Sequence, residues 1–126
     1  MNSCYWQGVL CVALLVTGCR EPFGCTGIWV PAIVVTVTDS VTGDPTAEGA
    51  FGAIREGSYI DSLRPSAYDG EGRLISLQAG GERPGTYAVV VGKSGYETWL
   101  RVDVQVESNQ CHVETVALEA RLKRLP

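Results

Sequence analysis

The sequence has little positive charge and only one histidine. Ten Lys and Arg stand against fourteen Asp and Glu, which gives a net charge of −4, and the largest basic cluster is Arg121, Lys123 and Arg124. Such a distribution offers no attractive surface to a polyanion, so we expect no nucleic-acid binding. One histidine is too few for most metal sites and most general-base chemistry, so we expect no metal, no cofactor and no enzymatic activity.

The sequence also lacks an apolar run of the roughly 20 residues that a bilayer-spanning helix needs. Its clearest apolar run, residues 9–16, has instead the length of the hydrophobic region of an export signal. We therefore expect residues 1–18 to be a signal peptide that is removed. Residues 1–8 contain no Lys or Arg, whereas signal peptides usually begin with positive charge.

The four residues that end this segment, Val16-Thr17-Gly18-Cys19, resemble the lipobox of bacterial lipoproteins. The resemblance implies that Cys19 is acylated and becomes the first residue of a protein anchored in the membrane by its lipid. Arg20 follows, where lipoproteins retained in the inner membrane have Asp, so the resemblance implies the outer membrane, facing the periplasm or the exterior. An ordinary secretory signal cut nearby is the alternative.

Cysteine usage predicts one disulfide bond. Cys4 and Cys11 lie in the segment expected to be removed and Cys19 in the lipobox, which leaves Cys25 and Cys111. A remaining pair in an exported domain is expected to be oxidised, so the two ends of the domain should be neighbours. The alternative is two unrelated buried thiols. His112, next to Cys111, is expected at the surface rather than in a metal site.

Short segments of alternating polarity, separated by turn residues, predict an all-β sandwich. No segment shows ten or more residues of helical periodicity. In the segment 96–106 we expect Leu100 and Val102 to face the core together with Val104 and Val106, and Trp99 to lie on the opposite face. We expect residues 119–126 to be a charged, frayed tail. The expected strands are residues 30–39, 48–55, 59–63, 73–77, 86–91, 96–106 and 111–118.

Two groups of residues resemble the carboxypeptidase regulatory-like domain. The first runs from Val35 to Asp39 and continues with Thr42-Gly43-Asp44-Pro45, and the second joins Gly85-Thr86-Tyr87 to Gly95-Tyr96. The resemblance covers residues 30–118, after a short tether of residues 19–29. It implies a seven-stranded antiparallel sandwich of the transthyretin-like, immunoglobulin-like type. Members of this family are non-catalytic modules, often appended to peptidases, transporters or carbohydrate-active proteins.

Aromatic side chains are the remaining indication of binding. Trp29, Tyr96 and Trp99 are the candidate binding residues, since an exposed aromatic ring can stack on a sugar or anchor a protein. Packing beneath a loop is the alternative for Trp99. We expect a lipid-anchored, extracytoplasmic β-sandwich of the cell envelope with a structural or protein-binding role. The alternative is a carbohydrate-binding module that uses Trp99.

Overall fold

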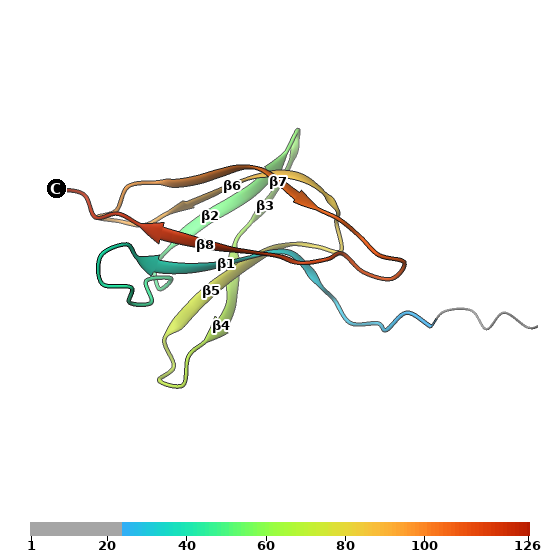
Figure 1. Cartoon of the computed structure of the whole chain (residues 1–126), viewed down its shortest axis with the longest axis horizontal. Helices are drawn as coiled ribbons and strands as arrows, with labels where there is room; N and C mark the ends of the chain where they lie inside the picture. Colours follow the sequence, from blue (N-terminus) through green and yellow to red (C-terminus); the bar gives the residue numbers. More distant parts are fainter. Residues whose placement is uncertain (1–23) are drawn as a thin grey trace, which may run out of the picture.

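The computed structural model describes residues 24–126, which form two four-stranded sheets that share one hydrophobic core, as in a β-sandwich (Figure 1). No helix occurs in this part of the chain. The first sheet has the order β4-β5-β1-β8 and the second the order β3-β2-β6-β7. The strands are β1 (Pro31–Asp39), β2 (Phe51–Glu56), β3 (Tyr59–Ser62), β4 (Arg64–Tyr68), β5 (Leu74–Gly81), β6 (Gly85–Gly92), β7 (Trp99–Val106) and β8 (Val116–Leu122).

The predicted all-β architecture is confirmed, with corrections to the strand count and the pairing. Eight strands replace the expected seven because sequence analysis missed β4. That strand begins Arg64-Pro65, and proline suits it because β4 lies at the edge of its sheet and pairs only with β5. The sheets are not wholly antiparallel either, since β1 and β8 run parallel.

The core is built from the inner faces of strands that alternate as predicted. On β1, Ile33, Val35 and Val37 are completely buried, and on β6 so are Val89 and Val91. Each such side chain contributes about 1.5 to 3 kcal/mol relative to an exposed one. The two sheets are therefore held together mainly by aliphatic side chains from their middle strands.

Residues 119–122, expected from their charge to begin a frayed tail, belong to a strand. β8 pairs with β1 from Val116 to Leu122, four residues beyond the predicted end of the strand. Ala120 and Leu122 are buried, whereas Glu119 and Arg121, which alternate with them, face solvent. The charges that suggested a tail thus occupy the outward positions of an ordinary strand.

A β-bulge interrupts β7. The register between β6 and β7 shifts by one residue, so that Val102 and Asp103 together stand opposite Ala88. The backbone of Asp103 is left-handed, with φ of 55°, a conformation in which Asp is more frequent than most residues. An extra residue on one strand changes which side chains face the core on the two sides of the bulge.

The predicted orientation of β7 is therefore correct after the bulge and wrong before it. Val104 and Val106 are buried as expected, but Leu100 and Val102 are exposed. Trp99, which was expected on the outside, packs partly against the core.

At the end of β1, the buried carboxylate of Asp39 links three segments of the chain. Its Oδ1 accepts hydrogen bonds from the backbone N–H groups of Val41 and Thr42, and its Oδ2 accepts from Arg124 Nε at 2.7 Å and from the Tyr96 hydroxyl at 3.0 Å. The bond from Arg124, followed by the backbone bonds, holds the pKa of Asp39 far below its usual value. The carboxylate therefore fixes the C-terminal residues against the first turn.

The predicted disulfide bond between Cys25 and Cys111 is present. Its two Cα atoms lie 5.2 Å apart although the cysteines are separated by 86 positions in sequence. In Figure 1 the N-terminal segment leaves the sandwich at one end and the C-terminus lies at the other. The disulfide thus joins the incoming segment to the loop between β7 and β8.

Replacing both Cys25 and Cys111 by Ser should lower the free energy of unfolding by about 4 kcal/mol, because the unfolded chain regains the entropy of a loop of 86 positions. Urea denaturation with and without reductant measures this loss. Reductant should have no effect on the double variant. Equal urea midpoints for the oxidised and reduced wild-type protein would contradict the prediction.

Acid should destabilise the protein partly through Asp39. Its pKa is lowered in the folded state, so its contribution to stability is complete above the unfolded-state value of about 3.9 and is lost as the pH falls below it. We expect Asp39→Asn to be less stable at pH 7 and to lose less stability on acidification. Urea midpoints measured between pH 7 and pH 2 test this, with Arg124→Gln as an intermediate case. A parallel acid dependence in wild type and Asp39→Asn would contradict it.

Candidate functional site

The sheet formed by β3, β2, β6 and β7 is apolar on its outer side as well as on its core side. Val90 alternates with the buried residues of β6 and so points outward. Its cross-strand partners on that side are Ala53 of β2 and Leu100 of β7. In the neighbouring row, Ala88 lies opposite Arg55. We call this surface the outer apolar face; it comprises Phe51, Ala53, Arg55, Ile60, Ala88, Val90, Leu100 and Val102.

Large side chains of the outer apolar face are open to solvent. Phe51 is 67% exposed, Leu100 58%, and Ile60 and Val102 54% each. A shallow hollow of about 330 Å³ lies among Ala53, Arg55, Ile60, Ala88 and Val90. Soluble monomers seldom leave contiguous apolar surface uncovered, and sheets that are apolar on both faces are normally covered on both. The face is therefore suited to contact another apolar surface.

Sequence analysis missed this face because it assigned Leu100 and Val102 to the core. The bulge at Asp103 turns both outward, beside Val90. No spacing in the sequence marks a bulge, and an Asp in a strand is only weak evidence for one. Phe51 and Ile60 belong to short strands whose alternation does not show which face is buried.

The candidate aromatic residues do not assemble into one exposed platform. Trp99 and Tyr96 both pack partly against the core. The Tyr96 hydroxyl is bound to Asp39, and the guanidinium of Arg101 lies 5.8 Å from the Trp99 ring centroid. Trp29 lies instead against Gly81, whose position leaves no room for a Cβ beside the indole. The exposed stacking surface on which a carbohydrate site would depend is thus absent around Trp99.

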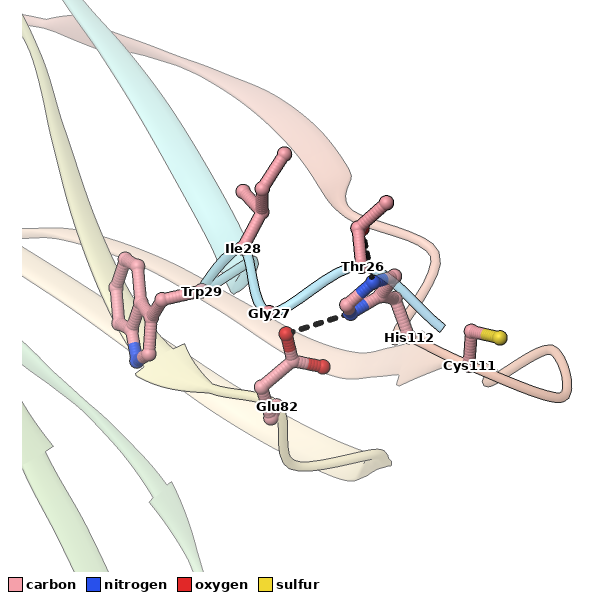
Figure 2. Close-up of a pocket in the computed structure, with 7 residues that line it drawn as sticks. All are labelled: Thr26, Gly27, Ile28, Trp29, Glu82, Cys111 and His112. Carbon is pink, nitrogen blue, oxygen red and sulfur yellow. Dashed lines mark hydrogen bonds and ion pairs between the residues drawn. The ribbon is translucent and has the colours of Figure 1, made fainter. Parts of the chain in front are cut away.

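A second hollow, of about 460 Å³, lies where the N-terminal segment meets the sandwich (Figure 2). Here His112 Nδ1 lies 2.8 Å from Glu82 Oε1, and His112 Nε2 lies 3.0 Å from Thr26 Oγ1. A carboxylate only accepts, so His112 Nδ1 donates to Glu82, while His112 Nε2 lies within hydrogen-bond distance of the Thr26 hydroxyl. Figure 2 shows Trp29 at one side of this group and Cys111 at the other.

Glu82 is the residue on which these contacts converge. Its Oε1 also accepts the backbone N–H of Val30 at 2.9 Å. Burial raises the pKa of Glu82, but the hydrogen bonds from His112 and Val30 outweigh it, so the pKa lies below its usual value. Its backbone is left-handed, with φ of 52°, which costs about 1 to 3 kcal/mol that these contacts help to offset.

The order hydroxyl, imidazole, carboxylate is also the order of a hydrolytic triad. An acyl-transfer site needs backbone donors for the developing oxyanion, and here the N–H groups of Cys111 and His112 both donate to Asn109 Oδ1 at 2.9 Å. The three side chains join the N-terminal segment to the two loops that carry Glu82 and His112, and we call Thr26, His112 and Glu82 the tether clamp.

Sequence analysis placed His112 at the surface and did not detect its partners. Its side chain is 20% exposed, because it lies between two segments. Thr26 is 86 positions away and Glu82 is 30 positions away, so only the tertiary fold brings the three residues together. The neighbouring disulfide was the only indication in the sequence that the N-terminal segment lies here.

Comparisons with known proteins add no identification. No family model and no curated protein matches the chain. Among residues 24–126, no group of three or more His, Cys, Asp or Glu is placed to hold a metal ion. A search of the same residues for a helix long and apolar enough to cross a bilayer found none. The lipidation site predicted at Cys19 lies outside the residues that the structure describes.

Replacing His112 by Ala should loosen the N-terminal segment without unfolding the sandwich. Loss of both imidazole contacts is expected to speed amide exchange of residues 26–30 about 30-fold, since each of the two hydrogen bonds contributes about 1 kcal/mol. Hydrogen–deuterium exchange with mass spectrometry measures this effect. Thr26→Val, which keeps the side-chain shape but removes the hydroxyl, should cause a smaller increase. Unchanged exchange in His112→Ala would show that the tether clamp does not hold the segment.

Proposed function

We propose that this protein is a non-catalytic, lipid-anchored β-sandwich of the cell envelope that binds a protein partner through its outer apolar face. The observation that carries the proposal is the exposure of Phe51, Ile60, Leu100 and Val102 on one continuous sheet surface. Burying such a surface against a partner is favourable by about 25 cal/mol per Å² of apolar area. Surface of this kind is costly to leave in water and marks binding sites.

Two features support a location outside the cytoplasm. The disulfide between Cys25 and Cys111 is of a kind that persists in oxidising compartments. The sequence before it combines an apolar run at residues 9–16 with the lipobox-like residues that end in Cys19. Arg20 favours the outer membrane over the inner one, by resemblance to sorted lipoproteins.

The geometry of the tether suits a body held close to a membrane. Cys19 and Cys25 are six residues apart, so even a fully extended chain spans only about 20 Å between them. The disulfide and the tether clamp fix the next residues of the segment to one end of the sandwich. That end would face the bilayer, with the C-terminus at the far end (Figure 1).

A transthyretin-like, carboxypeptidase regulatory-like domain remains our proposal for the fold family. The turn Thr42-Gly43-Asp44-Pro45 after β1 and the Gly85-Thr86-Tyr87 start of β6 support it, as does the two-sheet architecture. The resemblance implies a non-catalytic module, which agrees with a role in binding a protein partner.

The binding face can be tested by photo-crosslinking in cells that export the full chain. A benzoylphenylalanine introduced at Val90, on the outer apolar face, should give a discrete covalent protein adduct. Benzoylphenylalanine introduced instead at Val41, a more exposed valine in the turn after β1, should give no adduct. An absence of adducts from both positions would overturn the proposed binding role.

Cells that export the full chain also test whether a lipid on Cys19 anchors the protein. The wild-type chain should fractionate with membranes and carry a lipid mass on Cys19. The Cys19→Ser variant should lack that mass and should no longer fractionate with membranes. Mass spectrometry of the N-terminal peptide measures both. An unmodified Cys19 in the membrane fraction would contradict lipid anchoring but would leave the binding face open to its own test.

A further inference from the structure

Two rows of side chains cross the outer apolar face, and each is asymmetric. One row runs from the small Ala53 on β2 through Val90 on β6 to the large Leu100 on β7. The next row begins with Ile60 on β3 and passes Arg55 on β2 and Ala88 on β6. It ends at the bulge, where Val102 and the exposed, acidic Asp103 stand opposite Ala88. From β2 to β7, side-chain size therefore increases along the first row, and charge changes from positive to negative along the second.

A row of this kind is complementary to the same row of a second copy that runs in the opposite direction. A two-fold axis that runs along β6, between two facing sheets, places β7 of one copy over β2 of the other. Leu100 then meets Ala53, while Val90 meets Val90 on the axis. In the adjacent row, Arg55 of one copy lies over the β7 end of the row in the other copy, where Val102 and Asp103 stand opposite Ala88. A large residue thus fills the space over a small one, and each face supplies the opposite charge, as an isologous interface requires.

From these rows we propose that the partner of the outer apolar face is a second copy of this chain, bound through a two-fold axis parallel to β6. The inference rests on the proposed function, because it names the protein that the face binds. Facing sheets whose strands are nearly aligned pack well at about 10 Å, with a rotation of about 30°.

The direction of this axis also suits two anchored molecules. The strands run broadly along the long dimension of the sandwich, from the end where the N-terminal segment leaves to the end with the C-terminus (Figure 1). An axis parallel to the strands leaves the corresponding ends of both copies on the same side. Both tethers then reach one membrane, which an axis across the strands would prevent.

The size of the face sets the strength of the dimer. Three strands of six, eight and eight residues, at about 4.8 Å spacing and about 3.3 Å per residue, cover about 350 Å² on each copy. Two copies together bury on the order of 700 Å², an area typical of weak, transient complexes. Anchoring in one membrane raises the local concentration of such partners and so favours their association.

A charge exchange tests this dimer with the full exported chain, purified in mild detergent. Arg55→Glu sets a carboxylate against Asp103 of the other copy, and Asp103→Lys sets an ammonium group against Arg55. Each variant alone should therefore dimerise at least about tenfold more weakly. An equimolar mixture of the two variants should recover the dimer, since each mixed pair joins opposite charges. Sedimentation equilibrium over a concentration series measures all three samples and the wild type.

Lys123→Glu changes the net charge by the same amount as Arg55→Glu, but it lies just after β8, in the other sheet. This variant should leave dimerisation unchanged. Circular dichroism confirms that each variant is folded, and the Val90 crosslink replaces the exchange if Asp103→Lys does not fold. That crosslink should give an adduct of twice the chain mass, which is 13.5 kDa before any signal peptide is removed. The peptide joined to residue 90 should come from β6 of the second copy. An adduct of any other mass would overturn the dimer and keep the binding role. No adduct would overturn both.

Discussion

The two-residue period of the β-strand is the constraint on which this structure depends. Successive side chains point to opposite sides, so every strand must commit one set of residues to the core and the other to solvent or to a partner. On β1 the commitment is clear, because Val35 and Val37 are buried while Thr36 between them is exposed. On β6 both sets are apolar, and the second set forms part of the outer apolar face. The bulge at Asp103 extends that face to β7 by shifting the period of one strand by one residue.

The sequence therefore allowed prediction of the strands whose alternation is unbroken, and it misled where the period shifts or where charge hides it. β1 and β6 follow directly from their alternating valines. β8 does not, because Glu119 and Arg121 suggest an unstructured tail until their alternation with the buried Ala120 and Leu122 is noticed. β4 was not predicted. Proline usually argues against a strand, and only the tertiary structure shows that β4 lies at the edge of its sheet, where proline is tolerated. The bulge could not be predicted, since left-handed backbone at one Asp leaves no periodic trace.

The candidate sites divide in the same way. Counting cysteines was sufficient to pair Cys25 with Cys111, because the other three were assigned to the expected signal peptide and to the lipobox. The tether clamp could not be found by counting, since Thr26, Glu82 and His112 occur in three distant segments that the fold alone brings together. Trp99 illustrates the opposite error. The alternation of its strand predicted an outward side chain, either packed beneath a loop or exposed for binding, whereas the local shift in register turns it towards the core. Less conspicuous aliphatic residues provide the exposed surface.

The parallel pairing of β1 with β8 also orders events in time. β1 lies between β5 and β8, so its sheet stays incomplete until the residues up to Leu122 have been made. Pairings between segments so far apart in the sequence form slowly, because the entropy of closing the intervening chain is lost before the contacts are made. The strand order therefore makes folding of the first sheet a late event that needs both ends of the domain at once, rather than a process that advances hairpin by hairpin along the chain.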